Sequence, residues 1–169
     1  MINAAAMMAP ILSGKTMNLI SKILPQDNIL LDSESTSKKR MFERVGMLFE
    51  NNRQIARSQV FDSLFAREKL GSTGLGHSVA IPHGRIAKLR EATAAFVKTS
   101  YPIPFDAPDG QPVNLIFVLL VPERANDLHL QILGELAQMF SDTQFRNRLL
   151  DCKDAATTHR LFIDWQRPT

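Results

Sequence analysis

The chain has 169 residues, of which 44% are hydrophobic and 22% are charged, and a formal net charge of +3. This length suits one domain with a single core, and the scatter of basic residues among acidic ones argues against a nucleic-acid partner. The lone cysteine, Cys152, cannot form an internal disulfide, which fits a reducing cytoplasm, and no apolar run reaches the roughly 18–20 residues of a membrane span.

Residues 1–16 precede the point, at Met17, where regular apolar patterning begins. This segment lacks the positive first region and the cleavage site of a signal peptide, so we expect a weakly structured or appended extension. Ala9–Thr16 fits a loose P-loop pattern, but no strand precedes it and Pro10 lies inside it, so nucleotide binding is not expected. We therefore expect one domain over residues 17–165 and a short tail over 166–169.

The first half of the domain reads as a short strand, two helices, a loop and another strand. Apolar residues at helical spacing, preceded by several possible caps in Ser33–Ser37, predict a helix to about Asn51, and a second pattern ends at Gly71. Three glycines in six positions then exclude a helix. The expected elements are a strand at Ile29–Leu31, helices to Asn51 and from Ser58 to Gly71, a loop at Gly71–Gly76, and a strand at Ser78–Pro82.

The second half reads as two strands followed by three helices. Thr93–Thr99 and Val113–Val121 are strand candidates on either side of a proline-rich turn, Pro102–Pro112, and the second is apolar on both faces. A strand of that kind lies between two layers of helices. Helices follow from Asn126 or Asp127 to Phe140, from Asp142 to Leu150 and from Asp154 to Trp165. The pattern predicts a three-layer α/β domain.

The segment that indicates chemistry is Pro82-His83-Gly84, at the end of the predicted short strand. Proline fixes the backbone before the histidine, and glycine after it lets a phosphate or another backbone approach closely. An imidazole with an ordinary pKa of about 6.5 is a good nucleophile near neutral pH. His83 is therefore the candidate acceptor of a phosphoryl group.

Phosphoryl transfer depends on positioning and on positive partners for the phosphoryl oxygens. Arg67 lies near the end of the second predicted helix, and His129 lies in the first turn of a later one, where free N–H groups favour an anion. Ser72 and Thr73 add hydroxyl donors in the glycine loop. We expect these residues and Gly84 to support the phosphate.

Four segments, AREKLGSTGLG, AIPHGR, PVNLIFVLLVPE and LHLQIL, resemble the type-2 IIA domains of the bacterial phosphotransferase system, most closely the nitrogen-regulatory IIA proteins. The resemblance runs from about Met17 to Trp165. It implies a mixed sheet between helices, phosphorylation of His83 at Nε2 by a small histidine phosphocarrier protein (the NPr type), and a place beside the phosphate for Arg67 and His129. His77-Ser78 departs from the small or amide residues expected there.

The resulting hypothesis is a cytoplasmic phosphoryl carrier that regulates target proteins through its phosphorylation state, with no cofactor or metal. One alternative is a free-standing fructose- or mannitol-specific IIA component, and another is an anion- or protein-binding module that is not phosphorylated. A metal-dependent hydrolase using His77, His83 and His129 would need acidic ligands that the sequence does not place nearby. His77 and His159 are otherwise expected on the surface.

Overall fold

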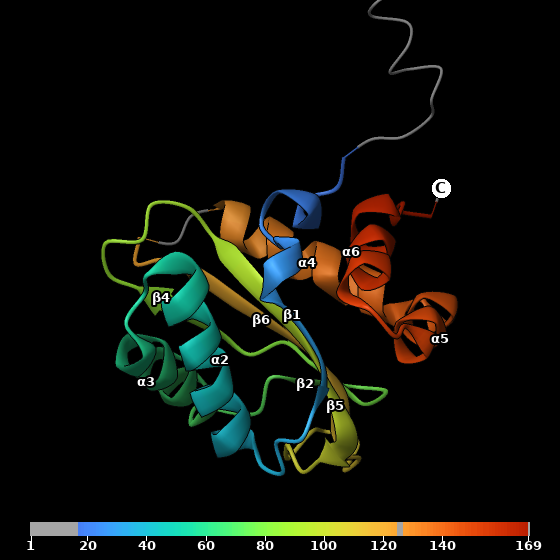
Figure 1. Ribbon diagram of the computed structural model, residues 1–169, viewed down its shortest axis with the longest axis horizontal. Helices are drawn as coiled ribbons and strands as arrows, with labels where there is room; N and C mark the ends of the chain where they lie inside the picture. Colours follow the sequence, from blue (N-terminus) through green and yellow to red (C-terminus); the bar gives the residue numbers. More distant parts are fainter. Residues whose placement is uncertain (1–16, 125–126, 169) are drawn as a thin grey trace, which may run out of the picture.

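The computed structural model describes residues 17–124 and 127–168, in which a sheet lies between two groups of helices (Figure 1). One face carries α2 (Lys38–Arg53) and α3 (Arg57–Glu68). The other face carries α4 (Asp127–Ser141), α5 (Thr143–Asp151) and α6 (Ala155–Asp164). The predicted three-layer α/β architecture is confirmed. The predicted extension 1–16 and the possible cap Asn126 lie outside the described residues.

The sheet is mixed and has six strands, in the order β1-β5-β6-β3-β2, with β4 also paired to β6. The strands β5 and β6 are antiparallel, as are β2 and β3, whereas β1 runs parallel to β5, and both β3 and β4 run parallel to β6. Their bounds are β1 (Ile29–Ser33), β2 (Gly74–Gly76), β3 (Val79–Ala80), β4 (His83–Ile86), β5 (Thr93–Ile103) and β6 (Val113–Pro122).

The strand predicted at Ser78–Pro82 is interrupted in the structure. Only Val79–Ala80 pair as β3, and the chain resumes pairing with the same neighbour, β6, at His83. Proline has no N–H to donate to the ladder, but the Pro82 carbonyl still accepts from Leu119 N–H at 2.9 Å, so the direction of the chain is kept. The prediction that His83 follows the end of a strand was therefore wrong, because His83 opens β4.

Other boundaries also differ from the predictions. β5 runs to Ile103, so the strand takes in Pro102, which was predicted in the turn, and a register shift falls between Lys98 and Ile103. The predicted glycine loop contains the short strand β2. Two 3-10 turns, η1 (Ile20–Lys22) and η2 (Gln26–Asn28), were not predicted, because three residues are too few to show a periodicity.

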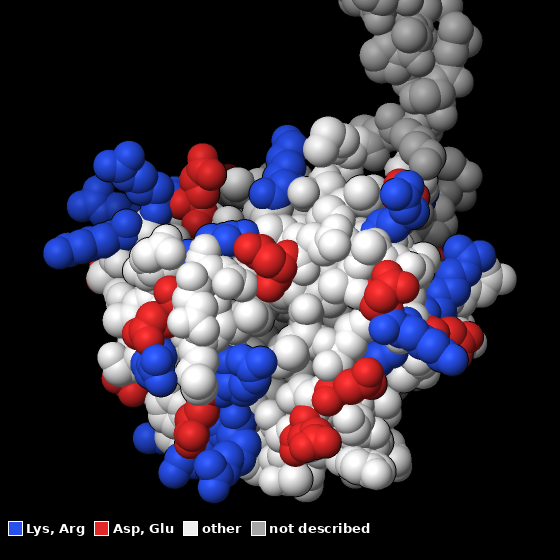
Figure 2. Space-filling model, viewed as in Figure 1, with Lys and Arg blue, Asp and Glu red and all other residues white. Residues whose placement is uncertain are grey.

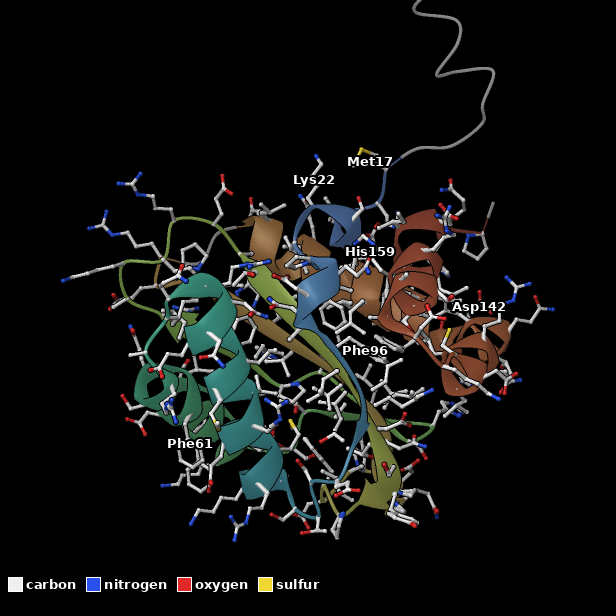
Figure 3. All side chains as sticks on the ribbon, in the orientation of Figure 1. Met17, Lys22, Phe61, Phe96, Asp142 and His159 are labelled. Carbon is white, nitrogen blue, oxygen red and sulfur yellow. The ribbon has the colours of Figure 1, made fainter. Side chains whose placement is uncertain are left out.

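Apolar side chains fill the space on both faces of the sheet. On the α4–α6 face the rings of Phe96, Phe117, Phe140 and Phe162 pack with centroids 5.0–6.3 Å apart. Figure 3 shows Phe96 on this side of the sheet. The α2–α3 face buries a second cluster that includes Met41, Phe42, Phe49, Val60 and Leu64. The central strand β6 is covered on both sides, as its sequence predicted.

Several side chains fix the ends of the helices. Ser37 accepts from Arg40 N–H at the start of α2, and Asp142 and Asp154 cap α5 and α6, as predicted. His159, predicted on the surface, is half-buried, with Nε2 3.0 Å from the Leu24 carbonyl (Figure 3). The prediction was wrong because α6 packs its inner side against η1 and η2.

The face seen in Figure 2 carries acidic and basic side chains side by side. In the described part of the chain, no helix combines the length and the apolar character needed to cross a membrane.

Candidate functional site

His83 is held at the start of β4 in a single tautomer. Its Nδ1 lies 2.9 Å from the Ile81 carbonyl oxygen. A carbonyl oxygen can only accept a hydrogen bond, so Nδ1 carries the proton and Nε2 carries the free lone pair. The ring is half-buried. Of the two ring nitrogens of His83, Nε2 is therefore the one that is free to act as a nucleophile.

The surroundings keep His83 uncharged near neutral pH. Burial is the largest influence and lowers the pKa of His83 below its ordinary value. The hydrogen bond to Ile81 and the negative charge of Glu68 act in the opposite direction, whereas the positive charge of Arg67 lowers the pKa further. A neutral ring keeps the Nε2 lone pair available for attack.

A second imidazole lies beside the first. His129, in the first turn of α4 as predicted, has its ring centroid 5.8 Å from that of His83, with the two ring planes at 90°. Its Nδ1 is buried and has no hydrogen-bond partner. Burial lowers the pKa of His129, and the charges of His83 and Arg85 lower it further. The site thus contains an unsatisfied polar atom that a phosphoryl oxygen or a water would satisfy.

Arg67 lies in the last turn of α3, close enough for its charge to act on His83. One guanidinium N–H donates to the Gly71 carbonyl at 2.8 Å, which ties the side chain to the glycine loop. An arginine has five N–H donors in a fixed plane, so others remain to bind an anion. The structure thus brings together the three side chains that the sequence analysis singled out as central: His83, His129 and Arg67.

The two loop hydroxyls have partners within the protein. Ser72 Oγ donates to the Phe105 carbonyl at 2.8 Å and accepts from Gly74 N–H at 3.0 Å. Thr73 Oγ1 donates to Glu68 Oε1 at 2.6 Å. Each hydroxyl has one proton, and both protons are already used. These contacts argue against the direct phosphate contact that the sequence analysis expected of Ser72 and Thr73.

Gly84 also has a different neighbour from the one expected. A Cβ at this position would lie 2.1 Å from Ser63 Oγ and 3.0 Å from the Ser63 carbonyl carbon. The glycine is buried, and the backbone that approaches it is that of α3. Gly84 therefore permits the close packing of α3, which carries Arg67, against β4, which carries His83.

Glu68 was not predicted as a site residue, although its position in the sequence carries a signal. Glu68 follows Val60 and Leu64 at intervals of four residues, so it falls on the buried stripe of α3, and it is 8% exposed. A carboxylate on an apolar stripe needs partners, and Glu68 has them in Thr73 and Lys38.

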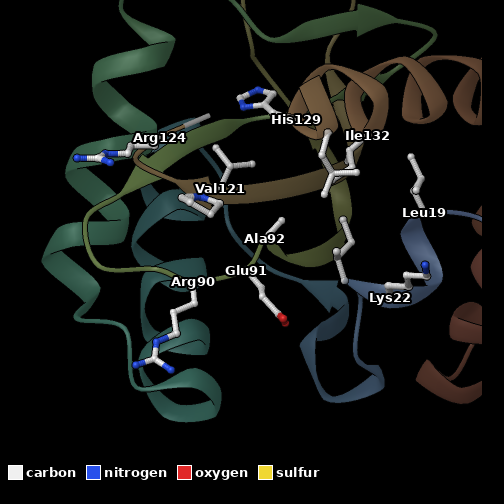
Figure 4. A pocket seen from close by; sticks show the side chains of 12 residues that line it. Leu19, Lys22, Arg90, Glu91, Ala92, Val121, Arg124, His129 and Ile132 are labelled. Atoms are coloured by element: carbon white, nitrogen blue, oxygen red, sulfur yellow. The ribbon is translucent and has the colours of Figure 1, made fainter. Parts of the chain in front are cut away.

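A hollow in the surface lies next to this site but is not lined by His83. It has a volume of about 330 Å³ and is lined by His129 and, among others, by Leu19, Ile23, Ala92 and Ile132 (Figure 4). The candidate site is the pair of imidazoles, because it holds the free Nε2 lone pair of His83 and the unpartnered Nδ1 of His129.

The remaining histidine of the predicted segment stands apart. The side chain of His77 is exposed and its backbone is in the left-handed conformation. The backbone N–H of His77 donates to Asp109 Oδ2 at 3.2 Å. Within residues 17–124 and 127–168 no group of three or more His, Cys, Asp or Glu side chains is arranged to hold a metal ion.

Residues 22–164 match the family described as "Phosphoenolpyruvate-dependent sugar phosphotransferase system, EIIA 2". The nitrogen regulatory protein of Pseudomonas aeruginosa is 38% identical over 148 residues, which cover 87% of this chain and 96% of that protein. The fructose-specific EIIA component of Haloferax volcanii is 32% identical over 146 residues, covering 86% and 95%.

Among solved structures, the nitrogen regulatory protein IIA-Ntr of Neisseria meningitidis is 51% identical to this chain. The two folds superpose with a TM-score of 0.81, over 86% of this chain and 99% of that one.

Proposed function

The chain belongs to the EIIA 2 family of the phosphoenolpyruvate-dependent sugar phosphotransferase system, with nitrogen regulatory proteins among its relatives, and on this basis we propose that it carries a phosphoryl group on Nε2 of His83. The observation that carries the proposal is the hydrogen bond from His83 Nδ1 to the Ile81 carbonyl at 2.9 Å. It fixes the tautomer in which Nε2 is the nucleophile, beside a second imidazole and a guanidinium.

The transfer moves one phosphoryl group between two imidazoles. The Nε2 lone pair of His83 attacks phosphorus and forms a new N–P bond, while the N–P bond of the phosphorylated donor breaks and its electron pair returns to the donor imidazole. The proton stays on Nδ1 of His83 throughout and is donated to the Ile81 carbonyl in a hydrogen bond. Arg67 and the first turn of α4, which carries His129, supply positive potential and donors for the phosphoryl oxygens.

The surroundings of the site suit a protein donor. Leu70 is 84% exposed just after α3, and Leu128 and Leu130, which flank His129, are 47% and 69% exposed. We take Leu128 and Leu130, the sequence neighbours of His129, as contacts for a partner protein. We propose that the donor is a small histidine phosphocarrier protein of the nitrogen branch (the NPr type).

Phosphorylation would also act as the regulatory signal. A phosphoryl group adds about −1.5 to −2 charges and three acceptor oxygens to a surface that carries Arg67 and Arg85. A target protein that recognises the positive surface would bind the unmodified form, and one that recognises the phosphate would bind the modified form. The output of the protein is thus a change in binding.

Reconstitution tests the proposal. Incubation with phosphoenolpyruvate, the first enzyme of the system and the carrier protein should add one acid-labile phosphoryl group, detected by intact mass. His83→Ala should abolish the addition, whereas the matched variant His77→Ala, which removes an exposed imidazole outside the site, should retain it. Addition that survives His83→Ala would show that another residue is the acceptor.

The sugar-specific alternative can be distinguished by its donor. The greater identity to nitrogen regulatory proteins, 38% against 32% for the fructose-specific component, favours the nitrogen branch. A faster transfer from the nitrogen-branch carrier than from the sugar-branch carrier is the expected result. The opposite order of rates would assign the chain to sugar uptake.

A further inference from the structure

Glu68 is a buried carboxylate whose two oxygens are both occupied. Oε1 accepts from the Thr73 hydroxyl at 2.6 Å, and Oε2 accepts from Thr73 N–H and from Lys38 Nζ, each at 3.0 Å. The side chain of Glu68 is 4% exposed, and Lys38 in turn lies over the ring of Phe105, 4.6 Å from its centroid. A buried carboxylate needs donors of this kind, and Glu68 has three.

These bonds continue from Glu68 to the candidate nucleophile. The Thr73 carbonyl accepts from Ile81 N–H at 3.0 Å, and the Ile81 carbonyl accepts from His83 Nδ1 at 2.9 Å. All the bonds point the same way, since every donor lies on the His83 side of its acceptor. The chain of contacts is therefore His83 to Ile81, Ile81 to Thr73, and Thr73 to Glu68.

We propose that Glu68 and Thr73 are positioning residues for His83, acting through this hydrogen-bond chain rather than by contact with the phosphoryl group. The inference rests on the proposed function, because it assigns these residues to the reaction of His83. It also gives Thr73 a different part from the one expected, since its hydroxyl is turned toward Glu68 and away from a phosphate.

The hydrogen-bond chain acts when positive charge develops on the imidazole ring of His83. As Nε2 bonds to phosphorus, the imidazole becomes more positive and its Nδ1 proton becomes a stronger donor to Ile81. Bonds aligned in one direction polarise one another, so a carboxylate at the far end strengthens the bond at the near end. The negative charge of Glu68 therefore stabilises the phosphorylated ring more than the free one.

The same carboxylate holds the loop that orients Arg67. Arg67 donates to Gly71, two residues before Thr73, while Thr73 is fixed to Glu68 by two hydrogen bonds. The loop is thus tied to the last turn of α3 at two residues, Gly71 and Thr73. Loss of the Glu68 bonds would release the loop and with it the guanidinium.

The charged and titratable groups that act on His83 or on its neighbour His129 come from three elements. Arg67 and Glu68 on α3 act on His83 directly, His83 interacts with His129 on α4, and Arg85 on β4 acts on His129. Among them Glu68 is the acidic one, and its charge raises the pKa of His83 against the effects of burial and of Arg67. Removal of its charge should lower the pKa of His83.

The test uses Glu68→Gln, Thr73→Val and the conservative variant Thr73→Ser in the full chain. The matched control is Thr158→Val, which removes another buried threonine hydroxyl, one that donates to the Asp154 carbonyl at 2.9 Å in α6. Two measurements are made: the rate of phosphorylation by the carrier protein and by phosphoramidate, and the NMR titration and Nδ1 proton resonance of 15N-labelled His83.

The expected results separate positioning from simple support of the fold. Glu68→Gln and Thr73→Val should slow phosphorylation by about tenfold, the rate equivalent of one lost hydrogen bond, with unchanged half-saturation by the carrier. Glu68→Gln should also lower the pKa of His83, and Thr73→Val should move the Nδ1 proton resonance toward that of a weaker hydrogen bond. Thr73→Ser should restore the rate, and Thr158→Val should change neither rate nor resonance.

Folded Glu68→Gln and Thr73→Val proteins with the wild-type rate and the wild-type His83 resonances would overturn the proposal. Should Glu68→Gln fail to fold, the comparison of Thr73→Val with Thr73→Ser decides alone. Should the wild-type chain accept no phosphoryl group, the proposed function fails, while the NMR comparison still shows whether Glu68 and Thr73 act on His83.

Discussion

Gly84→Ala tests the idea that α3 is packed against β4 to place Arg67 beside His83. The new Cβ would lie 2.1 Å from Ser63 Oγ, a separation far inside van der Waals contact, so either the Ser63 side chain or the whole of α3 must move. Rotation of the hydroxyl alone does not suffice, because the Ser63 backbone carbon and Cβ are also only 3.0 Å away.

The cost follows from this overpacking. An extra methyl group in a well-packed site destabilises by about 1–3 kcal/mol, and about 2 kcal/mol lowers the Tm of a domain of this size by about 4–8 °C. Movement of α3 would also change the position of Arg67 relative to His83. We therefore expect slower phosphorylation in addition to lower stability.

The assay is a double-mutant cycle with Ser63→Ala, followed by urea unfolding and by the rate of phosphoryl acceptance. Ser63→Ala removes the nearest atom, so the double variant should lose less free energy of unfolding than the two single variants together, by about 1 kcal/mol. Gly134→Ala is the matched control: it lies on α4 with no heavy atom within 4 Å, and should gain about 0.5–1 kcal/mol.

Additive effects of Gly84→Ala and Ser63→Ala, within about 0.5 kcal/mol, would refute the packing argument. So would a Gly84→Ala protein with wild-type stability. A stable protein whose phosphorylation is nevertheless abolished would show that Gly84 meets the donor or the phosphate directly, as the sequence analysis first supposed.

Three further predictions concern other parts of the chain. Lys98 is 8% exposed, and its Nζ donates to the carbonyls of Leu149, Leu150 and Cys152 at the end of α5. Lys98→Met should therefore lower the free energy of unfolding in urea by about 2–3 kcal/mol, and a loss under about 0.5 kcal/mol would contradict this. Asp142→Ala should cost about 1 kcal/mol, because Asp142 caps α5, and unchanged thermal stability would count against the cap. Burial lowers the pKa of His83, so its phosphorylation rate should stay constant from neutral pH down to the ordinary histidine pKa of about 6.5. The rate should decline only below that pH, where Nε2 takes up a proton. A decline that begins above it would mean that the pKa of His83 is raised.

The layers of the fold could be predicted because periodicity and capping are local. Val113–Val121 is apolar on both faces and became the central strand, and Asp142 and Asp154 cap the helices that they were expected to open. The break at Ile81-Pro82 was missed, because the pairing of both β3 and β4 with one neighbour is a property of β6 and not of the segment itself.

The candidate site was predictable where a residue's own chemistry decided its place. His83, His129 and Arg67 come together as expected. Each lies at a feature that the local sequence marks: a Pro-His-Gly segment, the start of a helix and the end of a helix. Ser72, Thr73 and Gly84 have other neighbours than expected, because their contacts are with Phe105, Glu68 and Ser63, residues that only the folded chain brings near.

The tautomer of the acceptor is the central claim, and NMR of the 15N-histidine-labelled protein before and after phosphorylation tests it most directly. We predict that His83 bears its proton on Nδ1 in both states and shows coupling between phosphorus and Nε2 after the reaction. Phosphorus on Nδ1 of His83, or on any other histidine, would contradict the account.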